Sequence, residues 1–559
     1  MKRVTRVLAA AAAAGALVLT GCASGGGSGS GKGSGDAPAA SDINAMDRSK
    51  LKEGGKLRLE IGTFPANFNY HQATGNTADY GTIHNFTMPT NFDNSADNKR
   101  TPNPNFIKDV KVEDGPPQVV TLTLNPDAKW GNGDPITAKD YIATWKALNG
   151  ENEGYEIAST DGYREVKEVK QGKDEFEVVT TFKSTYPDWQ SMWSTVENAE
   201  AVKDPETFNT ARQKEPHPEW AAGPFKISKV DQAQKMITLA PNENWWGDKP
   251  LLDEMTFKAM TPDLRGNAFA NNEIDVVTSI VTKDEFDKVQ KRSGAQVRAA
   301  SGLQWRHITF NNNAGNLKDK NVRQAIVKGT NRKAIAASDL AGLPVDVDKL
   351  MVGNHFFVPT DSEYADNSTD FKYDPKAAEK QLDEAGWKKE NGKDYRMKDG
   401  KELEIKYSML VGIPTSENEG KLFQDDMKKI GVKVNLVNTS QEEWQNVLQN
   451  RQFESVSFAW ESTVFPMNNI TQLYGCEAPQ NYSDACNETI KELTPKADTE
   501  LDQKKRAEIV NKIDKAIWDE VMVMPLYRRM DFTAVPSDLA NFGSFGLASP
   551  RAENIGFVK

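Results

Sequence analysis

The sequence holds few of the side chains that carry out chemistry. Its 559 residues include only 3 Cys and 5 His, the histidines are scattered, and neither an HExxH zinc motif nor a Walker A loop occurs. Those motifs hold a catalytic metal or nucleotide phosphates, so their absence argues against a zinc protease or an NTPase of these types. We therefore expect no metal site and no other cofactor.

Basic side chains are also in the minority. The chain has 80 acidic and 69 basic residues, and its formal net charge is −11. An acidic surface repels nucleic acid and anionic lipid headgroups, so neither is expected as a partner. The composition is typical of a secreted protein and by itself indicates no more specific function.

Long apolar runs are scarce as well. The one near the start, residues 7–18, follows three basic residues and precedes the small residues before Cys22. It is shorter than the roughly 20 residues that span a bilayer. The order of basic, apolar and small residues is typical of a secretory signal peptide, which we predict over residues 1–21.

The four residues that end this leader suggest an anchor. Leu19, Thr20, Gly21 and Cys22 resemble the bacterial lipobox, in which the peptide is cut before the cysteine and lipid is attached to it. Residues 22–40 are rich in Gly and Ser, a composition typical of a flexible tether. We predict a lipid-anchored protein on the extracellular face of the bacterial cell membrane. An ordinary signal peptide with a chance cysteine is the alternative.

The remaining cysteines are a single pair, Cys476 and Cys486. Outside the cell an even pair is most simply a disulfide. A metal or redox role is less favoured, because the spacing is not C-x-x-C and no histidine lies between them.

Local patterns predict a mixed α/β body. Thr137 and Asp140 form a capping box that starts a helix over 138–148. Asp374 followed by Pro375 starts another. Strands at 403–409 and 432–437 flank a helix at 421–430, which is the βαβ order of an α/β lobe. An apolar strand is expected at 521–527. A chain of this length is too long to fold around a single hydrophobic core, so two or three lobes are expected.

Six short motifs occur in a fixed order from about Gly54 to the end of the chain. One of them alone would be weak evidence, whereas six in the same order make chance an implausible explanation. They are WGNGDPITAKD at 130–140, GPF at 223–225, NWWG at 244–247, FNN at 310–312 with VRQAI at 322–326, YDPKAA at 373–378 with EAGW at 384–387, and PLY at 525–527.

Together these motifs resemble the dipeptide- and oligopeptide-binding lipoproteins of ABC importers, a family of extracellular solute-binding proteins. The resemblance implies an α/β, two-lobed clamshell with a periplasmic-binding-protein-like fold, an inserted small β-rich lobe, and a hinge of two crossing segments near His307 and Leu526. The implied parts are lobe I (41–90, 219–306 and 526–559), the inserted lobe (91–218) and lobe II (307–525).

The function implied by the resemblance is capture without catalysis. A monomeric receptor would hold an oligopeptide between two closing lobes and deliver it to the ABC permease subunits of the membrane. Some relatives bind oligosaccharides, nickel chelates or haem, so these ligands remain alternatives. A secreted hydrolase is the alternative of another class, and it is disfavoured because no motif places a pair of catalytic carboxylates.

The resemblance also indicates where a ligand would bind. The segment FAWEST at 458–463 matches an aromatic-ended strand in which peptide-binding members place an Asp three residues after the Trp. Here that position is Thr463, and the carboxylate is at Glu461. Either Glu461 acts from a shifted register or the ligand lacks a free amine there. We predict that Trp460 stacks on the ligand and Glu461 pairs with a cationic group. A solvated Glu beside a core Trp is the alternative.

Five further residues lie where members of the family present cleft residues. They come from an aromatic loop at 63–71 and from a strand around 305–308. A loop that packs only on its own lobe, and a strand histidine satisfied inside the core, are the competing interpretations. The residues are Phe68, Asn69, Tyr70, Trp305 and His307.

Overall fold

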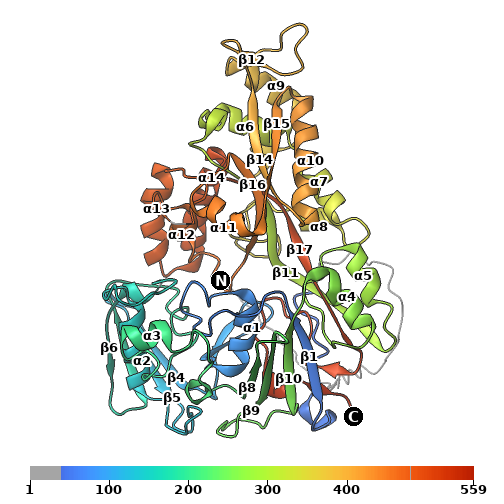
Figure 1. Cartoon of the computed structure of the whole chain (residues 1–559). Coiled ribbons are helices and arrows are strands. Elements are labelled where there is room, and N and C mark those ends of the chain that lie inside the picture. Colours follow the sequence, from blue (N-terminus) through green and yellow to red (C-terminus); the bar gives the residue numbers. More distant parts are fainter. Residues whose placement is uncertain (1–38, 161, 479) are drawn as a thin grey trace, which may run out of the picture. The chain divides into compact units, whose positions relative to one another are not determined.

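The computed structural model describes residues 39–160, 162–478 and 480–559 (Figure 1). The predicted signal peptide, Cys22 and the tether up to residue 38 lie outside these residues, so the structure does not test them. All elements named below belong to one structural unit, residues 38–559. None of the helices in the described ranges combines the length and the low polarity needed to cross a bilayer.

The first sheet joins distant parts of the chain in the order β1-β10-β9-β8. Apolar residues alternate along β1, so Leu57 and Leu59 are buried against α1 and the other strands. Val535 and Leu539, near the C-terminus, pack in the same core. The elements are η1 (Arg48–Lys50), β1 (Lys56–Ile61), α1 (Ala78–Thr87), β8 (Phe225–Asp231), β9 (Met236–Pro241), β10 (Glu254–Ala259), β18 (Leu539–Ala540), η6 (Ala552–Asn554) and β19 (Gly556–Phe557).

The second sheet is antiparallel, in the order β4-β5-β7-β6, and is formed within a single stretch of chain. Helix α2 covers it and has the predicted bounds, Ala138–Leu148, with the capping box between Thr137 and Asp140 in place. Trp130 and Trp193 are almost fully buried in its core. The other elements are β2 (Phe92–Asn94), β3 (Arg100–Pro102), β4 (Ile107–Glu113), β5 (Val119–Leu124), η2 (Tyr163–Glu165), β6 (Val166–Gln171), β7 (Glu177–Phe182), α3 (Pro205–Thr210) and η3 (Pro218–Trp220).

The third sheet has five strands in the order β15-β14-β16-β11-β17. β14 and β15 are parallel and are connected by α10, which confirms the predicted βαβ unit. Asp374 caps α9 as predicted, accepting from the backbone N–H of Ala377 at 2.9 Å. The elements are α9 (Pro375–Glu384), β12 (Met397–Lys398), β13 (Lys401–Glu402), β14 (Glu404–Leu410), α10 (Pro414–Lys429), β15 (Lys433–Thr439), α11 (Gln441–Gln449) and β16 (Ser455–Glu461).

Helix α10 begins earlier than predicted. The sequence suggested 421–430, whereas the helix starts at Pro414. Its first two turns are polar and show no apolar periodicity, which is why the pattern missed them. One face of these turns is nevertheless buried: the Glu419 carboxylate accepts a hydrogen bond from Arg306 Nε at 2.8 Å, and the Ser416 hydroxyl accepts from the backbone N–H of Leu410 at 2.9 Å.

Two unusually long strands, β11 (Ala295–Phe310) and β17 (Val523–Pro536), lie side by side (Figure 1). β16 pairs with β11 only from Gln304 onward, so the earlier part of β11 and the later part of β17 extend beyond the five-stranded sheet. There Val535 joins the core of the first sheet. The pairing shifts register between Ser301 and Trp305. Neighbouring helices are α4 (Pro262–Ala270) and α5 (Lys283–Val289).

The predicted apolar strand at 521–527 is longer than expected, since β17 continues to Pro536. Three charged residues follow Tyr527 and hid the strand from pattern analysis. The remaining elements of this part of the chain are η4 (Gly315–Lys318), α6 (Lys320–Gly329), α7 (Arg332–Asp339), α8 (Val347–Leu350), η5 (Thr369–Phe371), α12 (Ile470–Tyr474), α13 (Glu488–Thr499) and α14 (Gln503–Glu520).

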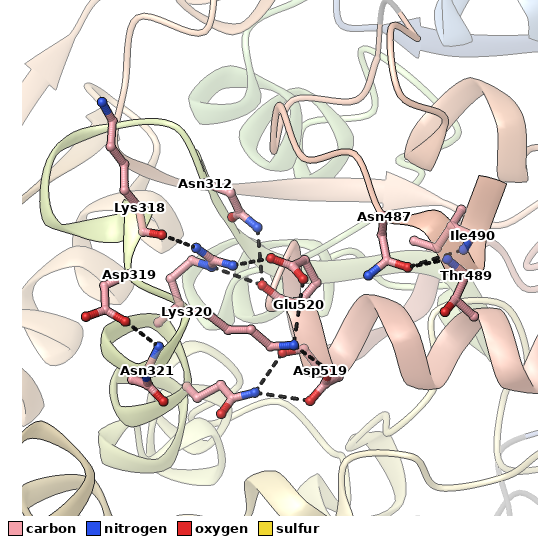
Figure 2. Close-up of polar contacts among 12 residues, drawn as sticks. Asn312, Lys318, Asp319, Lys320, Asn321, Asn487, Thr489, Ile490, Asp519 and Glu520 are labelled. Carbon is pink, nitrogen blue, oxygen red and sulfur yellow. Dashed lines mark hydrogen bonds and ion pairs between the residues drawn. The ribbon is translucent and has the colours of Figure 1, made fainter. Parts of the chain in front are cut away.

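The VRQAI motif fastens α6 to the end of α14. Arg323 donates to the backbone carbonyls of Leu317 at 2.7 Å and Glu520 at 3.0 Å, and it also pairs with the Glu520 carboxylate. Lys320 pairs with Asp519 at 2.5 Å (Figure 2). The motif therefore has a structural role: it satisfies carbonyl groups at a helix end that would otherwise lack partners.

Cys476 and Cys486 are joined by a disulfide. Closing a loop with a sequence separation of 10 is expected to stabilise the fold by about 3 kcal/mol, mainly by restricting the unfolded chain. We expect the double variant Cys476→Ser, Cys486→Ser to lose about that free energy of unfolding, measured by urea titration. A reductant should destabilise the wild type to the same extent and leave the variant unchanged. Equal stability of the two proteins would contradict this expectation.

Candidate functional site

A cavity of about 740 Å³ lies where the long strands meet the region around α1. We call it the first cavity. Its walls come from the loop before α1, from α1 itself, from the middle of β11 and β17, from the end of β16, and from the loop near the C-terminus. Its polar and aromatic wall residues include Tyr70, Asp79, Gln304, Glu461, Ser462, Thr463, Arg529 and Asp531.

The end of β16 carries the predicted anchor. Side chains alternate along a strand, so Trp460 and Glu461 point to opposite faces of the sheet. Glu461 lines the first cavity, as does Thr463 two residues later. Trp460 does not line it; its ring lies nearly parallel to the rings of Tyr482 (2°) and His307 (10°), with centroids 5.9 Å away in both cases. In this structure the strand presents the carboxylate to the cavity and the indole to an aromatic cluster.

Glu461 forms no ion pair with any residue in the described part of the chain. Its side chain is exposed to solvent, as in the alternative of a solvated Glu, yet partial desolvation within the cavity raises the pKa of its carboxyl group. A second acid, Asp531 on β17, also lines the cavity; burial raises its pKa to about 6, and the charge of Glu461 adds to the shift. The first cavity thus has an acidic end whose negative charge is incompletely compensated.

One guanidinium group borders the same cavity. Arg529 donates from Nη1 to the Gln304 side-chain oxygen at 3.0 Å and from Nη2 to the Thr415 hydroxyl at 3.4 Å. These contacts hold the Arg529 side chain between β11 and α10. The guanidinium therefore offers the cavity a fixed positive edge on the side of α10.

Tyr70 is the aromatic residue of the 63–71 loop that reaches the first cavity. Its ring stacks on His84 of α1, with centroids 4.6 Å apart and planes 28° apart. Burial lowers the pKa of His84 to about 3, so the ring is neutral at physiological pH. A Cβ at Gly81 would lie 3.4 Å from the Tyr70 ring, so glycine leaves room for this stacking.

Phe68 and Asn69 are placed differently from Tyr70. Phe68 is buried and packs edge-on against Tyr80, with ring centroids 5.6 Å apart. The Asn69 side chain donates to the backbone carbonyl of Phe208 at 2.8 Å. Neither residue lines the first cavity; both shape the loop that presents Tyr70.

Trp305 and His307, two residues apart on β11, are buried behind the cavity wall. Their rings lie 5.0 Å apart, and His307 also contacts Phe458 edge-on at 4.2 Å. Both ring nitrogens of His307 lack a hydrogen-bond partner among the described residues, and burial lowers its pKa well below the usual value. These two predicted cleft residues form part of the aromatic cluster, and neither borders the cavity.

The sequence analysis missed the contribution of β17. Arg529 and Asp531 belong to the run RRMD at 528–531, which follows the PLY motif. Three charged residues directly after an apolar strand were the available signal. Charges inside a strand are tolerated where the strand borders a solvent-filled cavity, and β17 borders the first cavity at this point.

A second cavity of about 700 Å³ shares Ser462 and Thr463 with the first. Two arginines line it. Arg528 is only 8 % exposed and donates from Nε to the backbone carbonyl of Gly302. Arg100 donates to the Ser194 hydroxyl at 2.9 Å, and its guanidinium carbon lies 5.0 Å from the centre of the Phe465 ring.

Next to the second cavity, segment 91–218 contacts the helices of segment 307–525. The Arg506 guanidinium and the Asp188 carboxylate form a two-pronged ion pair, at 2.8 and 2.5 Å, and both side chains are buried. The Thr185 hydroxyl donates to the carbonyl of Thr499 at 2.6 Å. These contacts join residues more than 300 positions apart in the chain.

The described residues contain no group of three or more His, Cys, Asp and Glu side chains arranged to hold a metal ion. The site is therefore best described by its shape and charge: a cleft bordered by two parts of one α/β chain, acidic on the side of Glu461 and bordered by arginines elsewhere. A two-lobed α/β fold with such a cleft defines a solute-binding protein.

Comparison with known proteins gives the family. Residues 101–482 match the model for bacterial extracellular solute-binding proteins, family 5 Middle. The oligopeptide-binding protein OppA of Mycobacterium tuberculosis (strain H37Rv) is 33 % identical over 524 residues, which cover 93 % of this chain and 87 % of OppA. The chain therefore belongs to family 5 of the extracellular solute-binding proteins, the substrate-binding components of ABC importers.

Solved structures show the same fold. The oligopeptide-binding protein AppA of Bacillus subtilis, in complex with a nonapeptide, has a TM-score of 0.77 at 21 % identity and covers 91 % of this chain and 100 % of its own. The periplasmic EDTA-binding protein EppA has a TM-score of 0.86 at 22 % identity, with 94 % and 100 % coverage. At these identities the likeness establishes the two-lobed periplasmic-binding-protein fold.

Proposed function

We propose that this chain captures oligopeptides without altering them and delivers them to the permease of an ABC importer. The observation that carries this proposal is the unpaired Glu461 carboxylate at the wall of the first cavity. A peptide ammonium group supplies the missing positive charge, because a carboxylate is stabilised by an opposite charge nearby, and the more so once closure of the lobes removes water from it. The extent of the similarity to OppA, whose name describes oligopeptide binding, supports the same ligand class.

We infer that the ligand is enclosed by closure about β11 and β17. These strands connect the first sheet with the five-stranded sheet and carry His307 and Leu526. On this proposal lobe I comprises 41–90, 219–306 and 526–559, the inserted lobe 91–218, and lobe II 307–525. Affinity then arises because the closed form contacts ligand on both sides, which the open form cannot do.

The proposal includes the anchoring inferred from the sequence. Lipid on Cys22 holds a monomeric receptor at the extracellular face of the membrane, close to its permease. Release of the ligand unchanged requires no catalytic group, and the incompletely compensated acids of the first cavity serve binding in this account. An acyl chain on Cys22 is detectable as added mass on the N-terminal peptide of the mature protein.

A thermal-shift screen of the full-length protein in detergent tests the ligand class. We expect di- to octapeptides to raise the free energy of unfolding by about 2.7 kcal/mol at one hundred times the dissociation constant. Oligosaccharides and nickel chelates should give no shift at equal concentration, and the recovered peptide should have its original mass. Stabilisation by a sugar or chelate and by no peptide would contradict the proposal, and cleavage of the peptide would contradict its non-enzymatic character.

A further inference from the structure

We propose that Glu197, a buried residue of segment 91–218, is a positioning residue for Tyr70 in the first cavity. Glu197 acts through His71, which follows Tyr70 in the chain. The inference rests on the proposed function, since it takes a peptide to be the molecule that Tyr70 contacts. It gives segment 91–218 a part in ligand recognition, although Glu197 does not itself line the first cavity.

The loop at 67–72, which carries Tyr70, is fastened to segment 91–218. The contacts involve residues before and after Tyr70, so they fix the backbone from which its ring projects. The hydrogen bonds run from the Phe68 N–H to the Arg212 carbonyl at 2.8 Å, from the Asn69 side chain to the Phe208 carbonyl at 2.8 Å, and from the Ala158 N–H to the His71 carbonyl at 2.7 Å.

Helix α1 holds the same loop at a point before Tyr70, where the Tyr80 hydroxyl donates to the carbonyl of Phe68 at 2.9 Å. The residue after Tyr70 is held by segment 91–218, which engages both the carbonyl and the ring of His71. The position of Tyr70 therefore depends on two parts of the chain, and the contact that follows it runs through His71.

Glu197 is the charged centre of this contact, and its side chain is fully buried. Arg212 donates from Nη1 to Oε2 of Glu197 at 2.8 Å, and Nε2 of His71 lies 3.1 Å from Oε1. Burial alone would raise the pKa of Glu197, but Arg212 and His71 lower it to about 2. The carboxylate is therefore ionised at physiological pH and attracts the imidazole next to Tyr70.

The position of Glu197 is itself fixed by α2. The backbone N–H of Glu197 donates to the hydroxyl of Thr144 at 3.0 Å, and Thr144 is completely buried. Two residues later, the N–H of Ala199 donates to the carboxylate of Asp140 at 2.9 Å. The carboxylate that attracts His71 thus projects from a backbone that is anchored to the core of the second sheet.

Tyr70 has a polar group available for a ligand. Its ring is held by stacking on His84, whereas its hydroxyl forms no hydrogen bond with any residue in the described ranges. Burial and then the charge of Glu461 raise the pKa of Tyr70, so the phenol stays protonated and faces the acidic end of the first cavity. A protonated phenol both donates and accepts hydrogen bonds, so small shifts of the loop change its contacts with a peptide.

A double-mutant cycle on the full-length protein tests the inference, with peptide affinity measured by calorimetry. We expect His71→Ala to weaken peptide binding by about 10-fold, within the usual range for coupled neighbours. In a Tyr70→Ala background the same substitution should change affinity less than 2-fold, because the side chain to be positioned is gone. The control Lys139→Ala, at an exposed ion pair of α2, should have no effect in either background.

Glu197→Gln should give a similar loss that likewise disappears in the Tyr70→Ala background. This variant leaves Arg212 buried without its partner and can fail to fold. His71→Ala keeps the Arg212–Glu197 pair intact, so it decides the matter alone if Glu197→Gln is unstable. Full affinity in His71→Ala, or an equal loss with and without Tyr70, would overturn the proposal.

Hydrogen–deuterium exchange of the ligand-free protein gives a readout that does not depend on peptide binding. We expect His71→Ala to raise the exchange of the amides at 67–72 and to leave those of α2 unchanged, because the loop loses one of its anchors. Unchanged exchange at 67–72 would overturn the positioning role. Failure of every peptide to bind the wild type would instead defeat the proposed function, and the exchange result would still decide whether Glu197 and His71 position the loop.

Discussion

Replacing Glu461 with glutamine is expected to weaken the binding of peptides with a free amino terminus by about 30- to 150-fold, or about 2–3 kcal/mol. The substitution keeps the size of the side chain and removes its charge. A peptide ammonium then enters the cavity without its counter-ion, and the remaining acids of the wall, Asp79 and Asp531, lie on α1 and β17. Binding constants from calorimetry measure the loss.

Two controls separate this effect from a general loss of binding. N-acetylated peptides have no ammonium group, so wild type and Glu461→Gln should bind them with equal affinity. The variant Glu113→Gln, at an exposed position of β4, should behave as the wild type with every peptide. If Glu461→Gln leaves affinity for free-amine peptides unchanged, Glu461 is not the anchor.

The affinity should also depend on pH in a defined direction. Burial raises the pKa of Glu461, and only the ionised carboxylate attracts an ammonium group. Affinity for free-amine peptides is therefore present above this raised pKa and is lost as the pH falls through it, at a higher pH than for a fully solvated glutamate. Glu461→Gln should remove this contribution to the pH profile.

Breaking the Asp188–Arg506 ion pair is expected to weaken all ligands alike. The pair joins the segments 91–218 and 307–525 in the present structure, and both side chains are buried in it. On the proposed closure the present structure is the closed form, and there Asp188→Asn leaves the Arg506 charge buried and unpaired at a cost of about 2–5 kcal/mol, whereas water solvates it in the proposed open form. Closure becomes less favourable by that amount, so every dissociation constant rises by the same factor, about 30-fold or more.

A double replacement distinguishes the loss of closure from misfolding. Asp188→Leu combined with Arg506→Met removes both charges and fills similar space, and such exchanges are often neutral or stabilising. We expect this variant to recover ligand affinity. Small-angle scattering of ligand-free protein should show a larger radius of gyration for Asp188→Asn than for the double variant. Equal radii and unchanged affinities would contradict a role of this ion pair in closure.

Local sequence rules predicted the elements whose signals are local. The capping box at Thr137 and Asp140 gave α2 with its observed bounds, and Asp374 with Pro375 gave the start of α9. The rules were wrong where burial is polar. The first turns of α10 are buried through Arg306 and the Leu410 backbone, and such contacts leave no apolar period in the sequence.

The sequence predicted the segment of the candidate site but not the direction of its side chains, because that direction depends on contacts between distant strands. Motif position identified the segment of Trp460 and Glu461, but the side that each residue faces depends on the pairing of β16 with β11. That pairing sends Glu461 to the first cavity and Trp460 to the aromatic cluster. Likewise, Arg528 and Asp531 reach the two cavities only because β17 continues past Tyr527 beside β11, a contact between segments over 200 residues apart.

The most direct test of the account is native mass spectrometry of the protein purified from its own host. The account predicts one unmodified peptide bound to each protein molecule, with its termini intact, released when the complex is unfolded. A bound oligosaccharide or metal chelate in place of the peptide, or a peptide that leaves the protein chemically changed, would contradict it.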